Sequence, residues 1–115
     1  MNRKTLKNIK KLIQKNGGLT INHKLEMLKS KRGFMVALAD YEKKLNIKDL
    51  TIDLLKEYLK VAKDKKAFVG FWLDGSTLYL DISYHLLSES SALIFGRLNH
   101  QLAIYDLSKN ESIYL

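Results

Sequence analysis

The fold of this chain is decided by the stretch Phe68-Val69-Gly70-Phe71-Trp72-Leu73-Asp74-Gly75-Ser76-Thr77-Leu78-Tyr79-Leu80-Asp81-Ile82-Ser83. Two runs rich in aromatic and β-branched residues flank Asp74-Gly75. Asp-Gly between such runs is a strong hairpin signal, because a type I′ turn needs positive φ at both central residues. After the turn the side chains alternate between two sets: Leu78, Leu80 and Ile82 on one face, and Thr77, Tyr79, Asp81 and Ser83 on the other. The stretch therefore predicts two antiparallel strands with one buried face.

Outward from this hairpin, periodicity and turn residues divide the rest of the chain. Helical spacing of apolar residues and capping signals predict helices over 2–16, 51–66 and 92–98. Short apolar runs predict strands over 19–22, 33–39, 101–107 and, as an optional last strand, 112–115. The first two of these strands are expected to form a hairpin around the polar connection 23–32, with 33–39 central or covered on both faces.

The resulting order is helix-strand-strand-helix-strand-strand-helix-strand, with the optional strand at the end. We predict a single α+β domain over residues 1–115, with a mainly antiparallel sheet of four to six strands and about three helices. The 115 residues are 46% hydrophobic, which is enough to bury a core.

Composition excludes several classes of protein. There is no cysteine, so neither a disulfide framework nor a thiolate metal site is available, and the chain fits a reducing cytoplasm. No apolar run approaches the ~20 residues needed to span a bilayer. The basic N-terminus is not followed by the apolar segment of a secretory signal. We therefore expect a cytoplasmic protein that has no membrane partner.

The net charge of +8 is unevenly distributed. Residues 1–66 hold 18 of the 20 basic residues and 7 of the 12 acidic ones, which gives +11, whereas residues 67–115 hold 2 and 5, which gives −3. One interpretation is a basic face that meets nucleic acid or an acidic protein. The other is a lysine-rich surface that only keeps the protein soluble.

The candidate binding residues are basic side chains of the first helix and of the 23–32 connection, with one aromatic residue: Lys4, Lys7, Lys11, Lys24, Lys29, Lys31, Arg32 and Trp72. The lysines of the first helix lie opposite its apolar side, where they form a solvated face, contact phosphates or acids, or lie on a membrane surface. The connection is the better candidate for phosphates, since loops supply adaptable contacts. Trp72 either stacks on a partner or packs across the strands.

The C-terminal part resembles a family of small proteins of bacteriophages and mobile elements. The resemblance rests on Gly33–Glu42, Val69–Asp74, Leu78–Ser83, Ala92–Gly96 and Asn99–Leu107, and covers roughly residues 33–115. Proteins of this type often sit among accessory genes, including those that counter host defence, such as anti-CRISPR proteins. The resemblance implies an accessory protein that inhibits a defence nuclease, and it brings over no catalytic residue.

No catalytic motif emerges from the residues. The three histidines are not spaced as a helical metal pair, and no phosphate-binding glycine pattern is present. Asp74, Asp81 and Asp106 are candidates for a divalent-ion site only if they converge; otherwise they serve turns and strand ends. We predict a non-enzymatic protein without metal or cofactor, which binds and inhibits a host defence protein or ribonucleoprotein complex of the CRISPR type. The alternative is a small basic protein that binds the phosphates of nucleic acid.

Overall fold

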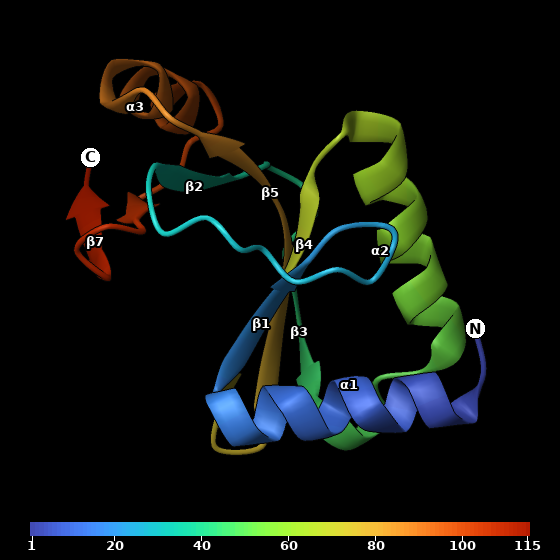
Figure 1. Ribbon diagram of the computed structural model, residues 1–115. Helices are drawn as coiled ribbons and strands as arrows, with labels where there is room; N and C mark the ends of the chain where they lie inside the picture. Colours follow the sequence, from blue (N-terminus) through green and yellow to red (C-terminus); the bar gives the residue numbers. More distant parts are fainter.

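The computed structural model describes all of residues 1–115, as three helices and a seven-stranded antiparallel sheet (Figure 1). The helices are α1 (Arg3–Asn16), α2 (Ile52–Lys65) and α3 (Glu89–Leu98), and a 3-10 turn covers Ile47–Asp49. The strands are β1 (Gly18–Ile21), β2 (Phe34–Ala37), β3 (Lys43–Asn46), β4 (Phe68–Asp74), β5 (Thr77–Leu86), β6 (Ala103–Asp106) and β7 (Glu111–Tyr114). The predicted α+β class with three helices is confirmed, and the sheet has one strand more than the upper limit of the prediction.

The β4–β5 hairpin is the centre of the sheet. The strand order is β1-β4-β5-β2-β6-β7, and β3 also pairs with β5. Strand β5 is ten residues long and has room for two partners on the edge away from β4. Its first half pairs with β3 there, and its second half pairs with β2. The stretch from which the sequence analysis began therefore positions every other strand: β1, β2 and β3 directly, β6 through β2, and β7 through β2 and β6.

The turn of this hairpin differs from the predicted one. Asp74 pairs with Thr77, so the two central residues are Gly75 and Ser76 rather than Asp74 and Gly75. Gly75 has φ +61°, whereas Ser76 is not among the residues with positive φ. Positive φ at the first central residue alone is typical of a type II′ turn, which favours glycine at that position.

Two strand predictions are wrong. Strands β1 and β2 do not form a hairpin, because β1 pairs with β4 and β2 pairs with β5 and β6. Their own patterns do not encode a partner, and the stronger β4–β5 hairpin separates them. Strand β3 was expected to be part of a connection, since its four residues include only one apolar side chain, Leu45. It pairs on the edge of β5, and the exposed lysines at 43 and 44 are typical of an edge strand.

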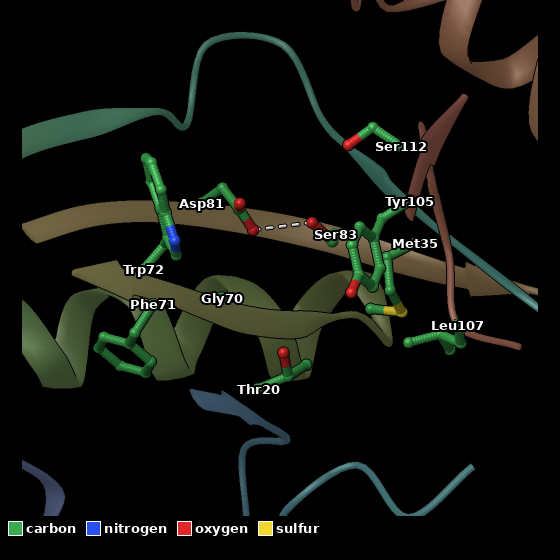
Figure 2. Close-up of a pocket in the computed structure, with 10 residues that line it drawn as sticks. All are labelled: Thr20, Met35, Gly70, Phe71, Trp72, Asp81, Ser83, Tyr105, Leu107 and Ser112. Carbon is green, nitrogen blue, oxygen red and sulfur yellow. Dashed lines mark hydrogen bonds between the residues drawn. The ribbon is translucent and has the colours of Figure 1, made fainter. Parts of the chain in front are cut away.

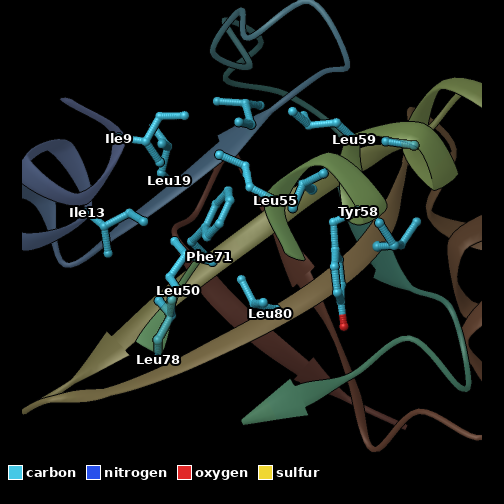
Figure 3. Close-up of a cluster of buried hydrophobic side chains, with 14 of the residues drawn as sticks. Ile9, Ile13, Leu19, Leu50, Leu55, Tyr58, Leu59, Phe71, Leu78 and Leu80 are labelled. Carbon is cyan, nitrogen blue, oxygen red and sulfur yellow. The ribbon is translucent and has the colours of Figure 1, made fainter. Parts of the chain in front are cut away.

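All three helices pack on one face of the sheet. The main core contains β4 and β5 side chains beneath Ile9 and Ile13 of α1 and Leu55 and Leu59 of α2 (Figure 3). Helix α3 packs on a smaller cluster around Val36, which lies on the same face because it is opposite Tyr84 in register. Strand β2 is thus central, which is one of the two alternatives predicted for it, and a helix covers only one of its faces.

Helix boundaries follow from capping groups. The side chains of Asn2, Thr51 and Ser88 each accept a hydrogen bond from the backbone N–H three residues later, at 3.0, 3.2 and 3.3 Å. Such caps satisfy N–H groups that have no partner within the helix. Helix α1 ends at Gly17, whose φ of +76° suits a residue without Cβ.

Candidate functional site

The face of the sheet away from the helices carries a row of aromatic and charged side chains. Tyr79 of β5 lies directly opposite Trp72 of β4 and Lys44 of β3. The Trp72 and Tyr79 ring centroids are 5.1 Å apart, and Lys44 Nζ is 5.7 Å from the Tyr79 centroid. Trp72 is nevertheless 58% exposed. Cross-strand packing of Trp72 therefore leaves much of its indole ring available to a partner.

Beside Trp72 this face is hollowed. The hollow has a volume of about 550 Å³ and is lined by residues of six strands and the β6–β7 turn: Thr20, Met35, Gly70, Phe71, Trp72, Asp81, Ser83, Tyr105, Leu107 and Ser112. Figure 2 shows Trp72 at one end, Met35 and Tyr105 at the other, and Asp81 between them. We call this feature the sheet hollow.

Asp81 is the one ionisable acid that lines the sheet hollow. The Ser83 hydroxyl donates to its Oδ1 at 2.7 Å. Gly70 lies directly across from Asp81 in register, and a Cβ on Gly70 would lie 2.4 Å from the same oxygen. Burial raises the pKa of the Asp81 carboxyl, and Glu42 raises it further, while the hydrogen bond from Ser83 opposes the shift. The carboxyl is seated in the sheet surface rather than extended into solvent.

The three aspartates named in the sequence analysis do not converge. Asp74 ends β4 at the hairpin turn. Asp106 is buried, and its Oδ1 accepts hydrogen bonds from the backbone N–H groups of Ser108 and Lys109. No group of three or more histidine, aspartate or glutamate side chains is arranged to hold a metal ion. The divalent-ion alternative therefore has no geometric basis at these residues.

Asn99 and Gln101 serve the end of α3. The Asn99 amide donates to the carbonyl oxygen of Phe95 at 3.0 Å and accepts from the backbone N–H of Ala39 at 3.2 Å. It therefore ties the helix to the chain that follows β2. The Gln101 amide donates to the Asn99 carbonyl oxygen at 3.2 Å.

A second surface lies on the outer side of α1. Lys7 and Lys11 line a groove of about 350 Å³ together with four further residues: Arg3, Leu6, Lys10 and Gln14. We call this feature the α1 groove. Helix α1 carries six basic residues and no acidic one. Lys4 is exposed on the same helix but does not line the groove.

The predicted binding residues do not form one surface. Helix α1 lies against the start of β1, which begins at Gly18, whereas the connection leaves the other end of β1 after Ile21 (Figure 1). Lys24, Lys29, Lys31 and Arg32 are exposed along this connection. Trp72 lies on the opposite side of the sheet from α1. The cations thus divide between α1 and the connection, and the aromatic residue belongs to a third region.

The connection is held by specific hydrogen bonds. Asn22 Oδ1 accepts from the backbone N–H groups of Lys24 and Glu26, at 2.9 and 3.0 Å. At the far end, the carbonyl oxygen of Arg32 lies 2.7 Å from Nε2 of His85 on β5. Both ends of the basic segment are therefore fixed to the fold.

Sequence reasoning missed several of these residues. Arg3 and Lys10 belong to the α1 groove, and their spacing of four and three residues from Lys7 is the signal that would have found them. Met35 and Tyr105 reach the sheet hollow only because β2 pairs with both β5 and β6, and no local pattern encodes that pairing.

In comparisons with known proteins, no protein family, curated protein or solved structure matches this chain. None of its helices combines the length and apolar character needed to cross a membrane.

Proposed function

We propose that this chain is a non-enzymatic binding module that uses the α1 groove to engage a polyanionic partner. In the specific form of the proposal, it is an accessory protein of a phage or mobile element, and it inhibits a CRISPR-type defence nuclease complex in the host cytoplasm. The mechanism is occlusion: the bound protein covers acidic or phosphate groups that the complex needs. The resemblance of residues 33–115 supports the specific form, and the α1 groove supports the general one.

The charge of α1 is the observation that carries the proposal. Arg3 and Lys4 occupy the first turn, where the helix dipole disfavours cations. Lys7 and Lys11, four residues apart, repel each other by a few tenths of a kcal/mol. These charges lower the stability of the helix, so solubility alone explains them poorly. A partner that supplies negative charge would remove the repulsion.

The first experiment measures binding of labelled duplex DNA and single-stranded RNA by fluorescence anisotropy, at 50 and 200 mM salt. If the four cations of the α1 groove contact phosphates of duplex DNA, log K should fall with log salt with a slope of about −3 to −4, or on the order of 10²-fold over this range. Lys7→Glu with Lys11→Glu should reduce the steepness of that slope by about 2. Arg97→Glu with Lys109→Glu reverses the same number of charges outside α1; it is the matched control and should leave the slope unchanged.

The second experiment separates inhibition of a complex from direct nucleic-acid binding. Purified guide-RNA nuclease complexes are assayed for DNA cleavage with and without the protein. The inhibitor proposal requires loss of cleavage at protein concentrations that do not retard free DNA or RNA, and recovery of cleavage with the double Lys→Glu variant. Binding to free nucleic acid without inhibition supports the phosphate-binding alternative. Salt-independent binding overturns both, and binding that is unaffected by the double variant overturns the assignment of the site to the α1 groove.

A further inference from the structure

The charge of the sheet hollow is opposite in sign to the net charge of the chain. Its lining includes no lysine or arginine, although the chain carries 20 of them. Asp81 is the only charged residue in that lining. A second hollow, of about 400 Å³, shares Trp72 and Asp81 and adds the acidic Glu42. Lys43 and Lys44 also line this second hollow, and Lys44 lies over the Tyr79 ring.

The carboxylate is built into the hollow. Ser83 is its one hydrogen-bond donor within the protein. No buried side-chain oxygen lacks a hydrogen-bond partner, so the Asp81 oxygen that Ser83 does not engage is not buried, and Asp81 lines the hollow. Gly70 provides the space in which the carboxylate sits. The Asp81 carboxylate is therefore a hydrogen-bond acceptor held in a fixed position beside the exposed indole ring of Trp72. This arrangement suits a ligand that carries a hydrogen-bond donor.

We propose that the sheet hollow binds the guanidinium group of an arginine side chain presented by a partner protein. The guanidinium would stack on Trp72 and donate to Asp81. Arginine fits better than lysine, because a planar guanidinium stacks on an aromatic face and donates two parallel hydrogen bonds to a carboxylate. A nucleotide fits less well, because the lining offers no cation to its phosphate. This inference goes beyond the proposed function, since it concerns the opposite face of the sheet and a ligand of opposite charge.

Trp72 provides a direct reporter, because it is the only tryptophan in the chain. Its emission is followed while acetyl-Gly-Arg-Gly-amide is added. The matched probe has citrulline in place of arginine, which keeps the shape and removes the charge. We expect a saturable change in emission with the arginine peptide and at least tenfold weaker binding of the citrulline peptide. Equal binding of the two peptides, or preferential binding of adenosine monophosphate, overturns the proposal.

Variants test the two contacts separately. Asp81→Asn keeps the size of the side chain and should weaken arginine-peptide binding at least tenfold, whereas Asp74→Asn, at the hairpin turn outside the hollow, should not change it. Trp72→Leu removes the stacking surface, and its binding is measured by calorimetry. Because Trp72 is exposed, this substitution leaves the core intact.

Unchanged binding by folded Asp81→Asn or Trp72→Leu, each checked by circular dichroism, overturns the proposal. Asp81→Asn should bind duplex DNA as the parent does, so failure of this inference is distinguishable from failure of the proposed function.

Discussion

At the scale of single residues, Gly70 and Asp81 form a matched pair. A Cβ at position 70 would lie 2.4 Å from Asp81 Oδ1 and 3.0 Å from its Cγ, so Gly70→Ala must displace the carboxylate from Ser83. Overpacking of this kind costs about 1–3 kcal/mol. We expect a loss near the lower end, because the clash is with a side chain that can move and because alanine reduces the entropy of the unfolded chain.

Denaturant unfolding of a double-mutant cycle measures this effect. Gly70→Ala should destabilise the parent, yet cost little or nothing when combined with Asp81→Ala, which removes the clashing carboxyl. If the two substitutions are additive, the glycine is not present to make room for Asp81.

Asp81 also predicts a pH dependence. Because the pKa of this carboxyl is raised above 3.8, the ordinary value for aspartate, the folded state binds more protons than the unfolded state between 3.8 and the folded pKa. The contribution of Asp81 to stability therefore falls as pH rises through that window and stays unfavourable above it. Asp81→Asn should become progressively more stable relative to the parent over the same window.

The titration can be followed directly by carbon-detected NMR of the Asp81 carboxyl. Ser83→Ala should move its pKa higher still, because the Ser83 hydrogen bond favours the charged form. The other titratable or charged groups near Asp81, on β5 itself and on the elements around it, are Glu42, Lys43, Lys44, Tyr58, Tyr79, His85 and Tyr105. A pKa that falls in Ser83→Ala would contradict this account. A carboxylate whose charged form disfavours folding fits a binding role.

At the scale of elements, α1 should show a trade between stability and binding. Lys7→Glu replaces two like-charge neighbours at i±4, Arg3 and Lys11, with opposite-charge pairs worth about 0.2–0.5 kcal/mol each. We expect thermal unfolding to shift upward while affinity for polyanions decreases. Lys7→Gln, which removes repulsion without adding attraction, should lie between the parent and Lys7→Glu in stability. A destabilised Lys7→Glu would show that Lys7 has a structural role.

The elements also show what the sequence could predict. Helix α2 was predicted closely, since Thr51 caps it and its buried residues Leu55, Tyr58, Leu59 and Ala62 recur at helical spacing. Strand β3 could not be predicted, because its pairing with β5 depends on backbone hydrogen bonds rather than on apolar side chains. Local sequence patterns identify helices and strands that bury an apolar face. They miss a short strand such as β3, which is stabilised by pairing with the edge of another strand.

The candidate sites, like the elements, could be predicted from the sequence only in part. The alternation after Gly75 placed Tyr79, Asp81 and Ser83 on one face correctly. That no helix covers this face, and that Tyr105 reaches it from β6, depend on long-range pairing. The basic residues were identified individually, but their division follows from the fold, in which α1 and the β1–β2 connection join the two different ends of β1.

At the scale of the whole molecule, stability should be uneven. The main core, to which α1 and α2 contribute, contains 17 buried residues, whereas the cluster to which α3 contributes contains three, Val36, Ala92 and Ile104. Because less apolar surface is buried there, we expect hydrogen exchange to show lower protection in α3, β6 and β7 than in β4 and β5. Ile104→Ala should lower protection mainly in that flank, and Leu55→Ala throughout the chain. Uniform protection would indicate a single cooperative unit.

The sheet also separates the two proposed binding surfaces, with the α1 groove on its helical side and the sheet hollow on the other. Sites that share no side chain usually contribute additively, within about 0.3–0.5 kcal/mol. The double variant Lys7→Glu with Lys11→Glu should therefore bind the arginine peptide like the parent, and Asp81→Asn should bind duplex DNA like the parent. Combining all three substitutions should lose both activities by the amounts seen separately. Coupling beyond that limit, with folding intact by circular dichroism, would mean that one partner spans the edge of the sheet and contacts both faces.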